Sequence, residues 1–499
     1  MNLSKSRYTT GVTCGKKLWL SCYKPEEAEE SENDDVFDNG TKIGELARGL
    51  LGDYVLVDYD TNYQNMINKT QEYLLKKPNI ICEASFSYDG NFCSVDILKN
   101  DLDGVELYEV KSSTKIGDIY LEDISYQTWL LRKSNINVKK ACLIRVNNNY
   151  VKQGEFDINK YFIIEDVTDK LDLDLVEENV KGLKEIINKK DEPNIDLSTA
   201  CNKPYPCPFF KYCTKKLPTP NVFDIGWKLQ FQKKLDMYYR HHVSFEDVLN
   251  KEVISNQKAL VQVKSFVNNT SPVVNKDNIK MLLDSITYPL YFLDFESFQD
   301  AVPRIDGTRP YQQICFQYSL HYYLKEDGKL YHKEYLSDEY DGDPMYGLCK
   351  RLTEDIPKNA CVIVYNKGFE QPRLREMAKL YPEFSEHLLN IHDNIVDLMI
   401  PFMNQDYYVK EMMGRSSIKL VLPALFPDDP ECSYDNLDQV HKGDEASAAY
   451  LLLPTLSKEE QERLRYNMLK YCGRDTYATV KLYEKLREVI KEKNYIKKR

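Results

Sequence analysis

Apolar and polar residues alternate along residues 80–151 in the way that is typical of β-strands. Three such stretches, ICEASFSYD, NFCSVDILKN and GVELYEVKSS, are separated by Asp-Gly turns at residues 89–90 and 103–104. A helical pattern in LEDISYQTWLLRKSN and a further strand pattern in VKKACLIRVNNNYV follow them. The pattern therefore predicts three antiparallel strands, then one helix, then one strand.

The following part of the chain predicts helices interrupted by one irregular stretch. Residues 165–190 have the apolar spacing of an amphipathic helix that ends in two lysines. CNKPYPCPFFKYC, residues 201–213, is too rich in proline and cysteine for a regular element, and LPTPN at 217–221 is typical of a boundary. Residues 222–285 read as polar helices.

A second alternating region begins at Tyr288. YPLYFLDFESF predicts a buried strand that carries acids. It is followed by a second strand pair in QICFQYSLHYYL, a helix, the short strand ACVIVYN and several helices. We therefore expect an α/β protein with domains at residues 1–217 and 285–499 and a helical connector at 218–284. The acidic run EEAEESENDD, residues 26–35, is expected to be a solvated loop.

Composition limits the classes of function. The 499 residues are 42% hydrophobic, and 78 acidic residues outnumber 67 basic ones, which excludes a uniformly basic surface but not a local basic groove. The chain has no apolar stretch of membrane-spanning length and no signal-peptide pattern at its start, so we expect a cytoplasmic protein without membrane contact. Its 13 cysteines are an odd number, which favours reduced thiols and makes any cysteine cluster a candidate metal site.

A first candidate site lies in the predicted hairpin strands. Glu109 and Lys111 project to the same side of one strand, and Asp96 lies on the preceding strand. Two carboxylates offer hard oxygen ligands to Mg²⁺ or Mn²⁺, while an ammonium can position water or stabilise charge on a phosphate. The alternative is an ordinary set of cross-strand ion pairs on a solvated face.

This region resembles the PD-(D/E)xK nucleases of the RecB type, which have a restriction-endonuclease-like α/β core. The resemblance implies that Glu83, Asp96 and Glu109 bind metal and that Lys111 and Gln127 are catalytic. The chain departs from the family pattern at position 131, where leucine replaces a frequent tyrosine.

A second candidate site is a set of cysteines. Cys201, Cys207 and Cys213 are separated by five residues each among prolines, and such an irregular backbone lets thiolates converge on a metal. RecB-type nucleases with an iron-sulfur cluster take a fourth cysteine near the N-terminus, which implies Cys14, with Cys22 as an alternative. The expected group is a structural [4Fe-4S] cluster, or zinc, and the alternative is a set of buried free thiols. In CRISPR-associated and AddB-type relatives, the first two late cysteines are separated by two residues, not by five.

A third candidate site combines acids of the C-terminal region. Asp294 and Glu296 lie two positions apart on one face of a buried strand, where two like charges require a counter-ion such as a divalent metal. The stretches YFLDFESF, VIVYNKGFEQPRL and YCGRDTYAT resemble, in order, the motifs of the DEDD (DnaQ-like) 3′-5′ exonucleases, which have an RNase H-like fold. The resemblance implies the metal ligands Asp294, Glu296, Glu370 and Asp475, and a catalytic Tyr471 that orients water.

Three details qualify the third site. Asn366, Phe369 and Glu370 match the second motif, but glutamate stands where aspartate is usual. Asp397 is a fallback ligand. Lys470 occupies the place of the histidine found in the other subtype, and His392 and His441 are out of register, so Tyr471 marks the tyrosine subtype.

Over its whole length the chain resembles bacterial proteins of domain of unknown function family 2779, through SIKLVLPALFP and MLKYCGRDTYAT. These observations predict a metal-dependent nuclease with Mg²⁺ or Mn²⁺ at both sites and nucleic acid as partner, with DNA favoured over RNA. Two alternatives stay open: a nucleic-acid-binding or assembly protein in which one or both sites are inactive, and a small-molecule phosphodiesterase.

Overall fold

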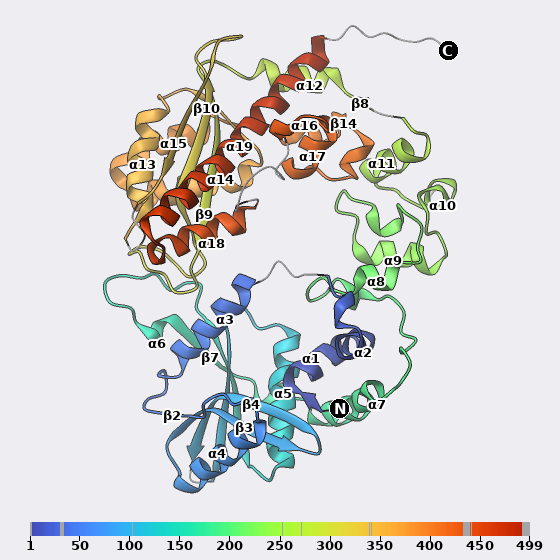
Figure 1. Ribbon diagram of the computed structural model, residues 1–499, viewed down its shortest axis with the longest axis vertical. Coiled ribbons are helices and arrows are strands. Elements are labelled where there is room, and N and C mark those ends of the chain that lie inside the picture. Colours follow the sequence, from blue (N-terminus) through green and yellow to red (C-terminus); the bar gives the residue numbers. More distant parts are fainter. Residues whose placement is uncertain are drawn as a thin grey trace. The chain divides into compact units, whose positions relative to one another are not determined.

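The computed structural model (Figure 1) describes residues 2–29, 34–101, 103–251, 253–270, 272–338, 340, 342–432, 440 and 442–491. The chain forms two compact units. The first consists of residues 1–216 and 300–311, and the second of residues 217–299 and 312–499. Both are mixed α/β structures, as the sequence predicts. Among the helices of the described residues, none combines the length and the apolar content needed to cross a lipid bilayer.

The first unit is built on a seven-stranded sheet with the strand order β2-β3-β4-β5-β6-β7, in which β1 pairs with β4. Its strands are β1 Leu3–Ser4, β2 Val55–Leu56, β3 Ile80–Tyr88, β4 Asn91–Asp101, β5 Gly104–Lys111, β6 Val138–Val146 and β7 Phe162–Asp166. Its helices are α1 Lys5–Thr13, α2 Gly15–Tyr23, α3 Asp34–Ala47, α4 Tyr63–Lys76, α5 Asp118–Lys133, α6 Ile158–Tyr161, α7 Leu173–Ile187 and α8 Phe210–Thr214.

The predicted order of three antiparallel strands, one helix and one strand is confirmed. Strands β3, β4 and β5 pair antiparallel, and α5 carries the chain to β6, which is parallel to β5. Asp89 and Gly90 both have positive φ, as the two-residue turn between β3 and β4 requires. All residues of α5 from Asp123 to Leu131 are buried, so this helix forms part of the core.

Two predicted elements differ from the structure. The helix expected at 165–190 begins only at Leu173, because residues 162–166 pair with β6 and Asp172 caps the helix by accepting from the backbone N–H of Leu175. Within the segment expected to be irregular, residues 210–214 form the short helix α8, since the prolines end at Pro208. Of the acidic run 26–35, residues 26 and 27 end a 3-10 turn, residues 30–33 lie outside the described residues, and residues 34 and 35 begin α3 and not a loop.

The first unit includes a segment from far along the chain. Residues 300–311 connect β9 to β10 of the second unit in sequence, yet they pack in the first unit. The backbone of Lys152 exchanges hydrogen bonds with Thr308 (3.0 Å) and Gly307 (2.8 Å), and the hydroxyl of Tyr161 donates to the carbonyl of Ala301 (2.8 Å). This segment is therefore an integral part of the first unit.

The second unit is built on a five-stranded sheet with the order β11-β10-β9-β12-β13 and a small pair, β14-β8. Its strands are β8 Val273–Val274, β9 Leu290–Gln299, β10 Gln313–Tyr323, β11 Leu330–Leu336, β12 Cys361–Val364, β13 Ile395–Asp397 and β14 Tyr407–Tyr408. Its helices are α9 Phe231–Tyr239, α10 Phe245–Asn250, α11 Gln257–Val267, α12 Lys276–Asp284, α13 Pro344–Asp355, α14 Lys367–Leu380, α15 Pro382–Asp393, α16 Ile400–Met403, α17 Ile418–Leu425, α18 Gly443–Leu452 and α19 Lys458–Lys491.

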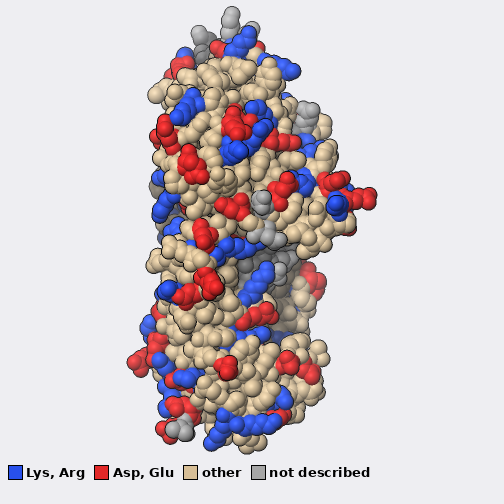
Figure 2. All heavy atoms as spheres, turned by 90° about the vertical axis from the view of Figure 1, so that its left-hand side faces the viewer, with Lys and Arg blue, Asp and Glu red and all other residues tan. Residues whose placement is uncertain are grey.

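Strand β9 is the centre of this sheet, antiparallel to β10 and parallel to β12. The long helix α19 packs along β9, β10 and β11, while α13 packs on β10 and contacts α15 (Figure 1). Because helices cover the sheet, β9 is apolar apart from the acids that the sequence analysis selected and its final Ser297 and Gln299. On the face drawn in Figure 2, lysine and arginine side chains alternate with acidic ones over the described residues, without a broad area of one sign.

Candidate functional site

The first candidate site lies where β4 and β5 separate. Their backbone pairing ends at Ile97 and Tyr108, and beyond this pair the carboxylate of Asp96 accepts a hydrogen bond from the backbone N–H of Val110 (2.7 Å). A side chain thus takes the place of the next ladder bond. This separation makes room for a polar cluster inside the sheet.

Glu109 is the buried centre of that cluster. Its Oε1 accepts from Lys111 Nζ (2.7 Å) and Lys5 Nζ (2.9 Å), and its Oε2 accepts from Gln127 Nε2 (2.7 Å). Asp123 of α5 also accepts from Lys111 (2.5 Å) and from Gln127 (3.0 Å). The structure therefore brings Glu109, Lys111 and Gln127 into direct contact and adds Lys5 and Asp123, which the sequence analysis missed.

The carboxyl groups of Glu109 and Asp96 differ in how readily they ionise. Burial alone would raise the pKa of Glu109, but Lys111 and Lys5 hold it well below its ordinary value. Burial and the charge of Glu109 raise the pKa of Asp96 to about 7. A divalent cation between them would favour the ionised form of Asp96, which is the situation expected of a metal ligand.

Glu83 lies at an irregularity of β3. It adopts a left-handed backbone conformation (φ 57°), the β3–β4 register skips it, and its carboxylate accepts from Arg48 Nη2 (3.1 Å). Its charge contributes to the raised pKa of Asp96, so it lies close to the site, but in this structure it is paired with arginine. Leu131, which replaces the tyrosine of the family pattern, is fully buried in the hydrophobic core.

The second candidate site is a narrow pocket that all four predicted cysteines line. Cys14, Cys201, Cys207 and Cys213 share it with Lys16, Lys17 and Phe209. Cys22 packs instead against the hydrophobic core of the first unit. The structure therefore groups Cys14, rather than Cys22, with the three late cysteines.

The chemistry of this pocket fits a metal centre. Cys14 joins α1 to α2, and the backbone N–H of Cys207 donates to the carbonyl of Cys201 (3.0 Å), which folds the late segment back on itself. Burial, with smaller contributions from the nearby thiols, raises the pKa of Cys213 to about 11, so several thiolates would not coexist there without a cation. Among the described residues, the group of possible ligand atoms that lie within 4.8 Å of one another does not include these thiols.

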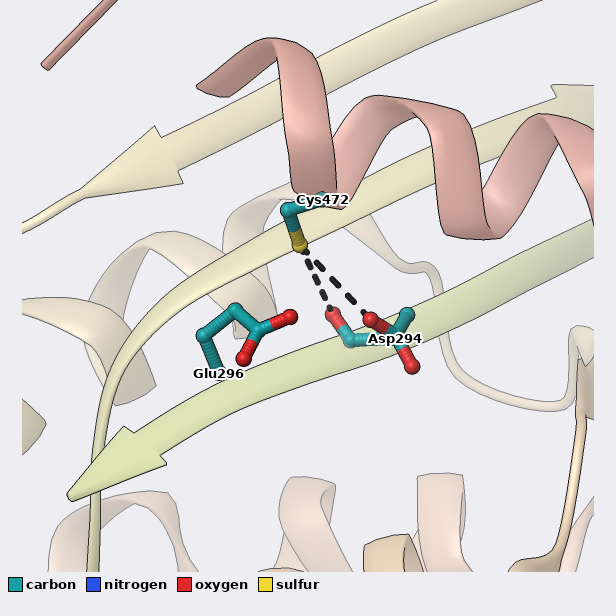
Figure 3. A group of neighbouring side chains, drawn as sticks. All are labelled: Asp294, Glu296 and Cys472. Atoms are coloured by element: carbon teal, nitrogen blue, oxygen red, sulfur yellow. Dashed lines mark hydrogen bonds between the residues drawn. The ribbon is translucent and has the colours of Figure 1, made fainter. Parts of the chain in front are cut away.

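The third candidate site lies between β9 and α19. Asp294 and Glu296 of β9 and Cys472 of α19 each offer a ligand atom, and these atoms lie within 4.8 Å of one another (Figure 3). The thiol of Cys472 lies 3.8 Å from Asp294 Oδ2 and 3.9 Å from its carbonyl oxygen. Among the described residues, this is the group that brings three possible ligand atoms so close together.

Electrostatics link the other predicted residues to the third site. Burial raises the pKa of Asp294, and the charge of Asp475 raises it further. Burial likewise raises the pKa of Glu296, where Asp294, Asp475 and Glu370 add to the effect and Lys419 opposes it. Several buried carboxyls thus stand close enough to disfavour one another's charge.

Glu370 at the start of α14 has an unusual environment. It is 2% exposed, and its Oε2 has no hydrogen-bond partner in the described part of the chain. Burial and the charge of Asp294 raise its pKa well above the ordinary value. A buried carboxylate oxygen without a donor, beside other acids, fits a site for a divalent cation.

The carboxylate of Asp397, the fallback ligand, is hydrogen-bonded to backbone N–H groups. Its carboxylate accepts from the backbone N–H groups of Asn366 (3.0 Å), Lys367 (3.2 Å) and Met399 (2.9 Å). It therefore fixes the start of the helix that carries Glu370. His392 pairs with Asp393 (2.7 Å), and His441 lies outside the described residues.

The residues that the sequence analysis missed differ in whether a local sequence pattern could have indicated them. Cys472 precedes Asp475 of the third motif by three residues, and Asp123 precedes Gln127 by four, so helical spacing could have found both. Lys5 lies 104 residues before its partner Glu109, and no local pattern connects the two.

The family model found by comparison with known proteins matches a segment that lies mainly in the second unit. Residues 291–417 match the family model described as Domain of unknown function (DUF2779), a span that includes Asp294, Glu296 and Glu370 and ends before Tyr471. The uncharacterized protein MG366 of Mycoplasma genitalium is 30% identical over 219 residues, which are 40% of this chain and 32% of that protein. The uncharacterized protein UU173 of Ureaplasma parvum is 26% identical over 257 residues, 46% of this chain and 37% of that protein. The chain thus spans about a third of the length of these relatives, and its 291–417 segment is similar to a family of unknown function, as the sequence predicts.

Proposed function

We propose that the chain is a metal-dependent nuclease that hydrolyses phosphodiester bonds of DNA or RNA. The observation that carries the proposal is the buried acid cluster of the second unit, in which Glu370 has an oxygen without a donor and three other ligand atoms lie within 4.8 Å of one another. Together with the DEDD-type motif order, this cluster supports a 3′-5′ exonuclease-like site on an RNase H-like fold.

In that site, Asp294, Glu296, Glu370 and Asp475 would hold Mg²⁺ or Mn²⁺. A bound divalent cation would polarise the phosphodiester and lower the pKa of a water molecule. Tyr471 is 3% exposed and lies on the same helix as Asp475, with the ammonium of Lys419 5.9 Å from its ring centre. Its hydroxyl would orient the water that attacks phosphorus.

In the first unit, we propose a PD-(D/E)xK-type site in which Glu83, Asp96 and Glu109 would hold the cation. Glu109 and Asp123 keep the pKa of Lys111 above its ordinary value despite burial, so this lysine stays protonated. Lys111 would therefore stabilise negative charge on the phosphate rather than accept a proton from water. Gln127 fixes the orientation of the Glu109 carboxylate through its hydrogen bond (2.7 Å).

The four-cysteine pocket supports a [4Fe-4S] cluster with a structural role, with zinc as the alternative. Cys14 would be joined to a loop about two hundred residues later, so the cluster would close a long stretch of the first unit.

The test uses the full chain and end-labelled single- and double-stranded DNA and RNA, each with Mg²⁺, Mn²⁺ or EDTA. Asp294→Asn and Lys111→Ala disable one site each, and a chain with both changes disables both. Asp284→Asn is the matched control, because this aspartate of the same unit is exposed at the end of α12. We expect metal-dependent cleavage that the doubly changed chain lacks and the control retains; cleavage equal to wild type in the doubly changed chain would contradict both sites.

A second candidate function is a nucleic-acid-binding protein in which one or both sites are inactive. Glu370 in the place of aspartate and the buried Leu131 in the place of tyrosine favour it. Binding of labelled strands without hydrolysis under either metal would support this function and refute the first.

A further inference from the structure

A pocket beside the third site has no role in the function proposed above. His321 of β10, His332 and Glu334 of β11, and Lys470, Arg474 and Tyr477 of α19 contribute to its lining. Its volume is about 370 Å³, and it is open to solvent. All of these residues belong to the second unit.

The pocket adjoins the acid cluster through one strand and one helix. Ser319 of β10 is the register partner of Asp294, and its hydroxyl hydrogen-bonds with His332 Nε2 (3.0 Å) and Thr476 Oγ1 (2.7 Å). Thr476 directly follows Asp475 on α19. The wall of the pocket therefore lies one strand away from the residues that would hold the metal.

The two histidines give this wall an uncharged aromatic surface. The rings of His321 and His332 stack with centroids 4.3 Å apart, and His321 Nδ1 is hydrogen-bonded to Thr476 Oγ1 (2.8 Å). Burial lowers the pKa of His321 to about 3, and it also lowers the pKa of His332, so both rings are neutral near pH 7. The positive charge of the pocket comes from Lys470 and Arg474, one helical turn apart, against the single acid Glu334.

We propose that this pocket binds one nucleotide of a single-stranded nucleic acid whose end lies in the adjacent acid cluster. Lys470 and Arg474 would contact a phosphate, and the histidine pair and Tyr477 would stack on a base. Gly473 of α19 supports this assignment, because a Cβ atom there would lie 3.7 Å from the His332 ring and a larger side chain would occupy the pocket. The inference rests on the proposed nuclease function, of which it would be a substrate-binding part.

The test measures binding separately from hydrolysis. Fluorescence anisotropy of labelled single-stranded DNA and RNA is recorded with the full chain in EDTA over a range of salt concentrations. The matched control for Lys470→Ala is Arg463→Ala, which removes the same charge from an exposed position of the same helix. We expect Lys470→Ala to weaken binding about three- to tenfold and to reduce the salt slope by about one, and Arg463→Ala to change Kd less than about twofold. Equal effects of the two changes would overturn the proposal.

A pocket-filling variant and a mononucleotide probe test whether the pocket binds a nucleotide of a strand. Gly473→Leu should weaken binding without lowering the melting temperature, because leucine favours a helix more than glycine does. A nucleoside monophosphate that binds wild type as tightly as the strand would overturn the proposed strand-binding role in favour of a mononucleotide site. Binding that depends on Lys470 in a chain that hydrolyses no strand would refute the nuclease function and leave the pocket in place. Hydrolysis by a chain whose strand binding does not depend on Lys470 would overturn the proposed nucleotide pocket and leave the nuclease function in place.

Discussion

Replacing Asp96 by asparagine is expected to stabilise the first unit when divalent cations are absent. In the folded chain, burial and Glu109 raise the pKa of Asp96 from 3.8 to about 7. The unfolded chain releases this proton near pH 4 and the folded chain keeps it until about pH 7, so the free energy of unfolding falls as the pH rises between these values. Asparagine stays neutral and keeps an oxygen that can accept from the Val110 N–H.

The size of the effect follows from the same pKa. At about 1.36 kcal/mol for each pH unit, the rise from 3.8 to about 7 sets an upper limit of about 4 kcal/mol above pH 7. Asp96 is only partly buried, so water reduces the cost of its charge, and we expect about 2 kcal/mol. The difference between variant and wild type should shrink towards pH 4, where both side chains are neutral.

The assay is urea unfolding followed by tryptophan fluorescence in EDTA, at pH 4.5 and pH 8. The chain has three tryptophans, and in a Trp227→Phe background only Trp19 and Trp129 remain, both buried in the first unit. The control is Asp103→Asn, since this side chain on the β4–β5 turn is 86% exposed. A variant less stable than wild type at pH 8, or a difference that does not change with pH, would contradict the raised pKa of Asp96.

Three other predictions concern the remaining residues. Cys207→Ser should remove the brown colour of anaerobically purified protein, while Cys22→Ser should keep it; colourless wild type with one zinc per chain would indicate zinc instead. Asp294→Asn should reduce kcat of exonucleolytic hydrolysis by several orders of magnitude, and Tyr471→Phe by about ten- to a thousandfold, because it removes only an orienting hydroxyl; the reverse order would contradict the site. Glu370→Asp should lower kcat, because it withdraws a carboxylate from a 2% exposed position that is built around glutamate, and a higher kcat would show that glutamate hampers the site.

Sequence patterns predicted the parts of the fold that local chemistry determines. The β3–β4 hairpin could be predicted because alternation and an Asp-Gly turn act within a few residues. The paired acids of β9 were visible because two residues is the repeat of a strand. Residues 165–166, which end β7, were assigned to the following helix, because two polar residues show neither period and only their pairing with β6 identifies the strand.

Contacts between distant segments could not be predicted in this way. Lys5 reaches Glu109 because β1 pairs with β4 and places α1 beside the site, which depends on the assembled sheet. The left-handed conformation of Glu83 and its ion pair with Arg48 are likewise consequences of packing, since glutamate has no local preference for positive φ. The open pocket beside His332 arises from the approach of α19 to β11 and leaves no signature in either segment.

The inserted segment 300–311 has a consequence for how this protein can be divided and inherited. A chain ending after Lys216 would contain the sheet, the acid cluster and the cysteines of the first unit, but it would leave the hydroxyl of buried Tyr161 without its partner Ala301. The second unit, expressed by itself, would carry residues 300–311 between β9 and β10 without the first unit, in which these residues pack. A gene cut at the apparent boundary therefore yields two incomplete proteins, and recombination that exchanges the first unit would have to transfer two separated stretches of coding sequence together.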